Sequence, residues 1–192
     1  VGDLSSCILL EPNDVSRYAL IYAGAQKNMG IAGLTVVIIR RDMVRDDLPD
    51  SVPTMLRYST HMKADSLYNT PPCQAIYMCG KVLRWLKGLG GLSAMAAINR
   101  DKAALLYDYL DQSRVFRGTA HPDSRSLMNV TFVTGDKEKD AAFIRFAEQR
   151  GLCGLKGHRS AGGMRASIYN AMTVQGVQVL VDCMAAFEGA QK

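Results

Sequence analysis

Two short runs of β-branched and aromatic residues near the start of the chain predict strands. They cover residues 18–22 and 34–39, with glycines close to both. Such runs are typical of buried strands, and the second is apolar on both faces, which predicts a sheet covered on both sides. Residues 23–33 between them hold three glycines and one lysine, and we expect a loop there.

Apolar residues at helical spacing predict two helices in the middle of the chain. Residues 46–53 are polar and 68–72 end in paired prolines, so both are expected to be loops or turns. A helix over 73–87 follows, because prolines suit a helix start, and the glycine-rich residues 88–91 end it. A second helix over 93–110 is expected to begin with Ser93 as its cap.

After this break the pattern changes to alternating strands and helices. Strands are predicted over residues 127–133 and 165–169, and amphipathic helices over 137–150 and 173–187. This β-α-β-α order predicts a small α+β domain. We therefore expect an α/β chain in two parts, residues 1–92 and 93–192.

The composition is that of a folded protein. Of the 192 residues, 48% are hydrophobic and 21% are charged, which suits a chain that buries a core without disulfides. No apolar run approaches the ~20 residues of a spanning helix. The chain begins with neither a basic nor a hydrophobic leader, so we expect no secretory signal. Because it begins with Val1 rather than methionine, we expect a piece of something longer.

Charge and cysteine content indicate which class of ligand and which cellular compartment to expect. The net charge is +5, but the basic residues are dispersed, without the stripe and stacking aromatics of nucleic-acid binders. A small anionic ligand fits better. Five cysteines without a C-x-x-C spacing argue against a disulfide framework and a zinc site, and favour buried thiols in a reducing, cytoplasmic compartment. The three histidines lie far apart, so no metal site is expected.

Three stretches carry candidate chemistry. Lys27 lies in a small-residue loop where burial would disfavour the ammonium form, as Schiff-base chemistry needs; a solvated turn lysine is the alternative. Asp3 is expected at a strand end, where it could hold a protonated ring nitrogen, or else it caps a turn. His158, Arg159 and Arg165 form either an anion site or an exposed basic loop.

Three segments, in this order, resemble the phosphoserine aminotransferases. They are AGAQKN at 23–28, YNTPP at 68–72 and KGHRSAGGMRASIYN at 156–170. The resemblance covers nearly all of the chain, and the third segment is specific to this enzyme. It implies that residues 1–92 are the end of the large, pyridoxal-phosphate-binding domain of a fold-type-I aminotransferase, followed by a small α+β carboxyl-terminal domain.

The resemblance also implies a reaction and a cofactor site. The family moves the amino group between L-glutamate and 3-phosphohydroxypyruvate, giving O-phospho-L-serine and 2-oxoglutarate in serine biosynthesis; in bacteria it also serves pyridoxine biosynthesis. By this match Lys27 would be the Schiff-base lysine and Gln26 its cofactor-contacting neighbour, while Asp3 would pair with the ring nitrogen. Asn69 and Thr70 would reach across a homodimer to the partner's cofactor phosphate.

The third segment would supply the substrate residues. Arg165 would grip the α-carboxylate, and His158 and Arg159 would help to receive the phosphate. The family's amino-terminal half is absent, so we expect it in cis or as a second chain, and we expect these residues alone to be inactive. The alternatives are another aminotransferase or a desulfurase-like enzyme of the same fold, a nucleic-acid-binding module, and a non-catalytic fragment or subunit.

Overall fold

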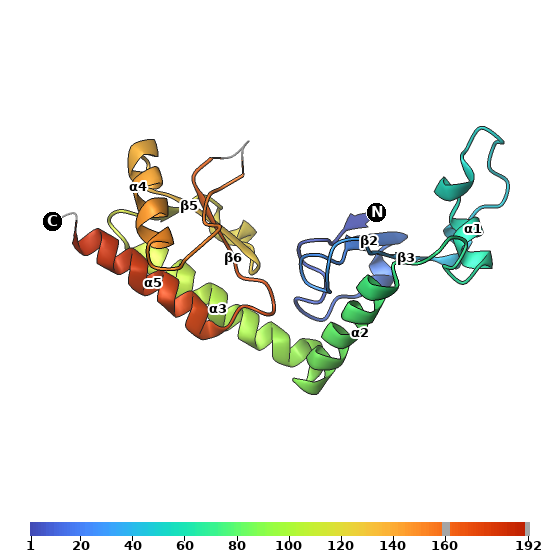
Figure 1. Cartoon of the computed structure of the whole chain (residues 1–192), viewed down its shortest axis with the longest axis horizontal. Coiled ribbons are helices and arrows are strands. Elements are labelled where there is room, and N and C mark those ends of the chain that lie inside the picture. The colour runs from blue at the N-terminus through green and yellow to red at the C-terminus, as the bar shows by residue number, and fades with distance from the viewer. Residues whose placement is uncertain (159–161, 191–192) are drawn as a thin grey trace. The chain divides into compact units, whose positions relative to one another are not determined.

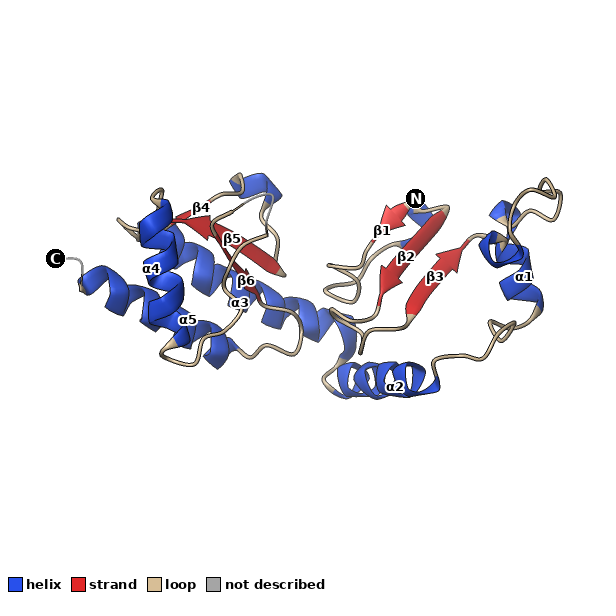
Figure 2. Ribbon diagram, turned by 45° about the horizontal axis from the view of Figure 1, so that its top comes forward, coloured by secondary structure: helices blue, strands red, loops and turns tan. Residues whose placement is uncertain are grey.

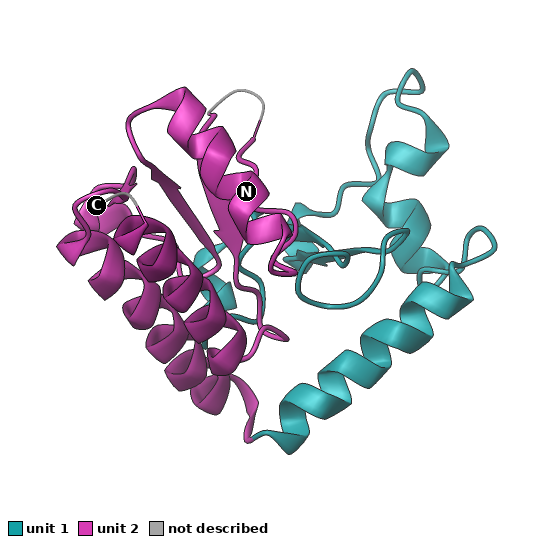
Figure 3. Cartoon of the chain, turned by 60° about the vertical axis from the view of Figure 1, so that its left-hand side comes forward, with its two compact units in different colours: residues 1–89 teal, residues 90–192 magenta. Residues whose placement is uncertain are grey.

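The computed structural model describes residues 1–158 and 162–190 of the chain (Figure 1). The chain divides into two compact units, residues 1–89 and 90–192, which are coloured separately in Figure 3. Each unit has its own three-stranded sheet. The assignment of residues 1–92 and 93–192 to two enzyme domains stays a prediction. Within the described ranges, no helix is long and apolar enough to cross a membrane.

The first unit is built on a mixed sheet in the order β1-β2-β3, whose strands lie side by side in Figure 2. β1 (Gly2–Asp3) is parallel to β2 (Leu20–Gly24), which is antiparallel to β3 (Thr35–Ile39). The strands predicted at 18–22 and 34–39 therefore exist, although the first begins and ends two residues later. Of β1, only the strand end at Asp3 was expected, because two residues are too short for a hydrophobic pattern.

Among the described residues of the first unit, those that cover this sheet lie on one face, so the expected cover of both faces is not supplied by this unit alone. Ala23 of β2 belongs to a small buried cluster with Met29 and with Cys79 of α2 (Cys73–Gly88). Side chains alternate across a strand, and on the opposite face Tyr22 and Val37 are exposed. The second face of the sheet is thus left open by this unit.

The helices of the first unit match the sequence pattern in part. α2 follows the predicted helix 73–87 to within one residue, and residues 46–53 form no helix or strand, as predicted. The six-residue helix α1 (Tyr58–Lys63) was not predicted, because it is too short to show a helical period. Three single 3₁₀ turns complete the unit, at Val15–Arg17, Arg41–Met43 and Thr54–Leu56.

The second unit is an antiparallel sheet in the order β4-β5-β6, with helices packed against one face. The predicted order of strands and helices from residue 93 onward is confirmed, with the short strand β4 as an addition. α3 begins at Gly91, and its cap is Gly90 rather than Ser93. The elements are α3 (Gly91–Gln112), β4 (Arg117–Gly118), β5 (Asn129–Val133), α4 (Lys137–Glu148), β6 (Met164–Ser167) and α5 (Val174–Gly189).

Aromatic rings form the centre of the second unit. The ring of Phe143 meets those of Phe116 and Phe187 edge to face, with centroids 4.7 and 5.3 Å apart. Such pairs contribute about 0.5–1.5 kcal/mol beyond their buried area. Two helix starts are capped by side chains: Asp136 accepts from backbone N–H groups of α4, and Thr173 accepts from one in α5. The unit is therefore fixed by both packing and local hydrogen bonds.

The cysteines only partly follow the prediction of buried thiols. All five are free; Cys79 and Cys183 are buried, Cys7 is half-buried, and Cys73 and Cys153 are exposed. Among the described residues, no group of three or more His, Cys, Asp or Glu side chains is arranged to hold a metal ion.

Candidate active site

Asp3 and Lys27 are brought to one edge of the first sheet. Asp3 is the last residue of β1, a strand end as the sequence predicted. Lys27 lies in the turn at residues 25–29 that directly follows β2. Because β1 and β2 are parallel, their carboxyl ends meet at the same edge. Open α/β sheets bind their ligands outside this edge.

The turn that carries Lys27 is anchored from below. The buried side chain of Asn28 donates from Nδ2 to the carbonyl oxygen of Ile8, at 2.9 Å. The backbone N–H of Gly30 donates to the carbonyl oxygen of Ala25, at 2.8 Å. A Cβ atom on Gly30 would lie 3.3 Å from the backbone nitrogen of Cys79, so glycine allows α2 to pack directly against the turn. The backbone under the lysine is thereby fixed.

Asp3 is held in its ionised form by hydrogen bonds. The hydroxyl and the backbone N–H of Ser5 donate to its Oδ1, at 2.7 and 2.9 Å. These bonds are the main reason that the pKa of Asp3 is lowered, with smaller contributions from the hydroxyl of Tyr22 and the charge of Lys27. The Asp3 charge in turn raises the pKa of Tyr22. A carboxylate held in this way suits a ligand nitrogen that carries a proton.

Lys27 is exposed in this chain, which matches the alternative of a solvated turn lysine rather than an amine in a dry pocket. The apolar residues of its turn, Ala25 and Met29, pack into the buried cluster and therefore do not cover the amine. Its Nζ donates to the Oγ of Ser6, at 2.6 Å. Gln26, the neighbour assigned to cofactor contact, is exposed as well.

Ser5 and Ser6 were missed by sequence reasoning. Each hydroxyl contacts one of the two predicted groups: Ser5 contacts Asp3, and Ser6 contacts Lys27. The available signal was two hydroxyl residues close behind a strand-end carboxylate, a pattern that is common in ordinary turns. Only the fold shows that the second hydroxyl meets a lysine 21 positions away.

Asn69 and Thr70 lie in the exposed segment between α1 and α2. The Nδ2 of Asn69 donates to the carbonyl oxygen of Thr70, at 3.1 Å. In the described part of the chain, no hydrogen bond joins either side chain to Asp3 or Lys27. Their assignment to a partner's cofactor stays a prediction.

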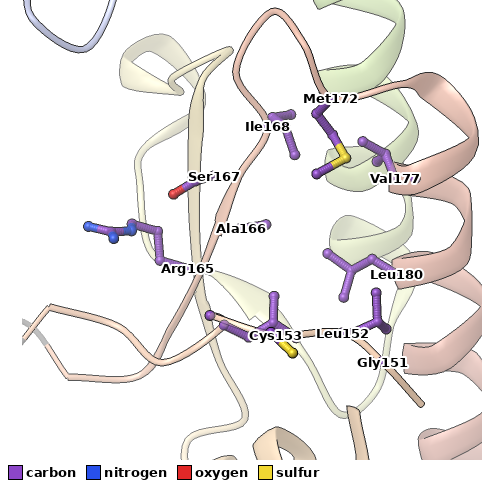
Figure 4. Close-up of a pocket in the computed structure, with 13 residues that line it drawn as sticks. Gly151, Leu152, Cys153, Arg165, Ala166, Ser167, Ile168, Met172, Val177 and Leu180 are labelled. Atoms are coloured by element: carbon purple, nitrogen blue, oxygen red, sulfur yellow. The ribbon is translucent and has the colours of Figure 1, made fainter. Parts of the chain in front are cut away.

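Arg165 lies on the face of the second sheet that its helices leave uncovered. Along β6, Ala166 and Ile168 point into the core, while Arg165 and Ser167 point away from it (Figure 4). Arg165 stands opposite Thr131 of β5. Its Nε is buried, and no described residue accepts a hydrogen bond from it. Buried donors without an acceptor are rare in native proteins, so this one marks Arg165 as a candidate for contact with an anion.

The end of β6 is fixed from behind by a buried lysine. Lys102 of α3 is fully buried, and its Nζ donates to the carbonyl oxygens of Ile168 and Tyr169, at 3.1 and 2.9 Å. Burial lowers the pKa of Lys102 to about 8. Beside it, the Nδ2 of Asn99 donates to the Oδ1 of Asn170, at 2.9 Å. These contacts set the position of the strand that carries Arg165.

The pocket shown in Figure 4 lies behind β6 and is largely apolar. Its lining includes Leu152, Val177 and Leu180, and its volume is about 320 Å³. Arg165 contributes to its rim, but its guanidinium points away from these apolar side chains. This pocket therefore lacks the charge that an anionic substrate requires.

His158 lies in a more basic setting within the second unit. It is exposed and lines a pocket of about 390 Å³ together with Lys137 and Lys156. Gly157 and Gly162 lie close together, because a Cβ atom on Gly157 would lie 2.0 Å from the carbonyl oxygen of Gly162. In the described lining two lysines face one carboxylate, that of Asp140, so the pocket is a candidate for an anion. Arg159, the other predicted member, lies outside the described residues.

Comparison with known proteins adds a family and close relatives. The family model described as aminotransferase class-V matches residues 1–180. The chain is 56% identical over 188 residues to a phosphoserine aminotransferase of Bacillus cereus, and equally to one of Lactiplantibacillus plantarum. Each match covers 98% of this chain and 52% of the relative. The chain thus spans about half the length of the curated relatives that it matches.

Solved structures agree. A phosphoserine aminotransferase from Bacillus circulans subsp. alkalophilus matches with a TM-score of 0.96 and 49% identity, over 100% of this chain and 53% of that one. A phosphoserine aminotransferase with bound pyridoxal phosphate, from Trichomonas vaginalis, matches with a TM-score of 0.91 and 40% identity, over 95% of this chain and 52% of that one.

Proposed function

The chain belongs to the class-V aminotransferase family, and we propose from this that it is the carboxyl-terminal part of a phosphoserine aminotransferase. It would take part in transferring the amino group between L-glutamate and 3-phosphohydroxypyruvate, in serine biosynthesis, with pyridoxal phosphate as cofactor. The observation that carries the proposal is the meeting of Asp3 and Lys27 at one sheet edge. The mixed α/β fold and its match to fold-type-I enzymes, both predicted, support it.

The residues present fit the cofactor. Hydrogen bonds from Ser5 keep Asp3 ionised, as a partner for a protonated ring nitrogen must be. Lys27 offers an exposed primary amine whose charge acts on Asp3. Pyridoxal phosphate, when bound, supplies the ring that accepts the electron pair of the substrate Cα–H bond. Asp3 and Gln26 would hold the cofactor at the carboxyl-terminal edge of the first sheet.

Lys27 would act as the general base and acid. Its Nζ, when free, would take the proton from the substrate Cα and return one during the other half of the reaction. Contacts of Asn28 and Gly30 fix the backbone of the turn that carries Lys27. Only the lysine side chain therefore has to move. Such positioning of a catalytic group contributes much of an enzyme's rate.

The second unit would bind the substrate. Arg165 has a free buried donor at Nε and would grip the α-carboxylate, which orients the Cα–H bond. His158, with Lys137 and Lys156 nearby, would receive the doubly charged phosphate together with Arg159. Selectivity for phosphorylated substrates would rest on this basic pocket.

The proposal extends to assembly and setting. Asn69 and Thr70 would contribute to the partner's site in a cytoplasmic homodimer, and the reaction would also serve pyridoxine biosynthesis. The exposed position of Lys27 supports a site that is completed by a further part of the protein, in cis or as a second chain. The 192 residues by themselves would not transaminate.

The proposal is tested by supplying the missing half. The chain is co-expressed with the amino-terminal part of the Bacillus cereus relative, purified with pyridoxal phosphate, reduced with borohydride and digested. We expect cofactor mass on the Lys27 peptide, and phosphoserine from glutamate and 3-phosphohydroxypyruvate. Lys27→Ala should lower the rate by about 10³-fold or more. Lys63→Ala, which removes an exposed lysine of the same unit paired with Asp46, is the matched control and should change little.

Two results would contradict the proposal. One is the absence of cofactor from Lys27 in a folded, assembled sample. The other is an equal rate with unphosphorylated hydroxypyruvate, which would favour the alternative of another aminotransferase of this fold. Activity of the chain alone would contradict the part of the proposal that concerns the missing half.

A further inference from the structure

Two adjacent serines each contact one of the two candidate groups of the first unit, Ser5 the Asp3 carboxylate and Ser6 the Lys27 amine. The Ser5 hydroxyl donates to Asp3 at 2.7 Å and accepts from the backbone N–H of Gly24 at 3.1 Å. The Ser6 hydroxyl accepts from the Nζ of Lys27 at 2.6 Å. Ser5 thus ties the carboxylate to the neighbouring strand, while Ser6 alone reaches the amine.

The bond to Ser6 matters because the lysine side chain is otherwise unconfined. Lys27 is exposed, and its amine stands on a flexible four-carbon stem that can adopt many rotamers. A general base must be within hydrogen-bond reach of the proton that it takes. Among the described residues, the Ser6 oxygen is the hydrogen-bond acceptor for this amine.

The position of Ser6 suits this task. It lies in the segment that directly follows β1. Leu4 of the same segment donates from its backbone N–H to the carbonyl oxygen of Tyr22, at 2.9 Å. Ser6 is half-buried, whereas Lys27 is exposed. The Ser6 hydroxyl is therefore the more fixed of the two groups, and the Lys27 side chain adjusts its rotamer to reach it.

We propose that Ser6 is a positioning residue, whose hydroxyl holds the Lys27 amine beside Asp3 whenever that amine carries no covalent partner. The hydroxyl accepts a hydrogen bond from Nζ, and no covalent bond changes. Its catalytic consequence rests on the proposed function, since only then does Lys27 move a proton. The hydroxyl–amine contact itself does not depend on that function.

The contact is tested on the full chain by competitive acetylation. Lysines are labelled at low reagent concentration and fixed pH, and each labelling rate is obtained by mass spectrometry. Ser6→Ala should raise the Lys27 rate by about 2- to 5-fold, the size expected for one lost hydrogen bond. Ser6→Thr keeps a hydroxyl and should restore the parent rate. Ser16→Ala removes an exposed serine that bonds Asp14, and should leave Lys27 unchanged.

The catalytic consequence is tested in the co-expressed, cofactor-loaded protein. Ser6→Ala should lower kcat by about 5- to 20-fold, because the base is less well positioned, while the KM for glutamate changes by less than about 2-fold. The isotope effect from Cα-deuterated glutamate should increase, because proton transfer becomes more rate-limiting. Ser6→Thr should recover both values.

The outcomes separate this inference from the proposed function. An unchanged Lys27 labelling rate in Ser6→Ala, with the parent circular dichroism retained, overturns the inference. So does a loss of activity that appears only in KM, or one that Ser6→Thr does not recover. If labelling rises as expected but no cofactor ever attaches to Lys27, the contact stands and the proposed function fails.

Discussion

The two units differ in how completely they bury their own apolar side chains. The second unit encloses a cluster of 18 buried residues, whereas the cluster of the first sheet has five. All but three of the exposed large hydrophobic side chains among the described residues lie in the first unit, the three being Met172, Val174 and Val179. Apolar side chains that one unit leaves exposed in such number are typical of surface that another part of a protein covers. The comparison teaches that the second unit buries its own apolar core, whereas the first unit needs a further part of the protein to cover its apolar side chains.

The largest expected effect comes from separating the units. A fragment of residues 90–192 should unfold cooperatively in urea, because it keeps its whole core, whereas residues 1–89 should aggregate or bind a hydrophobic dye without a cooperative transition. Far-ultraviolet circular dichroism and dye fluorescence measure both. A cooperative transition in the fragment 1–89 would break the comparison.

Core truncation should differ sharply between the units. Phe143→Ala removes a fully buried ring that contacts Phe116 and Phe187 and should lower the free energy of unfolding by about 3–5 kcal/mol. Val37→Ala on the open face of the first sheet should change it by less than about 0.5 kcal/mol. Urea denaturation of the two variants gives both values, and equal losses would contradict the difference in packing.

The buried lysine of the second unit should make stability depend on pH. The pKa of Lys102 is lowered to about 8 in the folded chain from 10.5 for an exposed lysine. Between these values the unfolded state binds more protons, so stability rises as pH increases from about 8 to 10.5 and is least below that window. We expect a rise of about 1–3 kcal/mol that Lys102→Met lacks.

The slope rather than the absolute stability is the readout, because Lys102→Met also leaves the carbonyl oxygens of Ile168 and Tyr169 without their donor. Tyr109, whose pKa is raised to about 12 chiefly by burial, acts with the opposite sign above pH 10 and is present in both proteins. Identical slopes in the parent and the variant would show that Lys102 is not desolvated.

The smallest expected effect concerns helix starts. Asp136 accepts from two backbone N–H groups at the start of α4, and Asp136→Ala should cost about 1 kcal/mol, while Asp136→Asn should keep most of the capping. α2 of the first unit has no side-chain cap at Pro72, so it has no such bond to lose. Thermal unfolding of the two Asp136 variants measures the contribution, which should be absent if α4 depends on packing alone.

The long helices and the strands β2 and β3 of the first unit could be predicted from the sequence, because each presents a run of apolar residues. α2 matched to within one residue. The short elements could not, since β1 and β4 have two residues each and α1 has six. Ser93 was wrongly predicted as a cap, because the composition of a glycine-rich break does not reveal at which residue the next helix begins.

The site was predictable in its residue types but not in its surroundings. The strand end at Asp3 was expected, although no hydrophobic pattern marks the two-residue strand β1. The exposure of Lys27 did not, because the sequence does not show that its small and apolar neighbours turn toward Cys79. Lys102 occupies a helical position in line with Met95 and Leu106, and only the carbonyl oxygens that end β6 explain why a lysine is buried there.

The close approach of Gly30 to α2 has a mechanical consequence. With its missing Cβ only 3.3 Å from the backbone of Cys79, the turn and the helix cannot slide past one another. Asn69 and Thr70 precede α2, separated from its first residue by Pro71 and Pro72, so a displacement of this segment would act on the helix that packs against the turn of Lys27. Binding at Asn69 and Thr70 would in this way change the orientation of the Lys27 amine without contacting it.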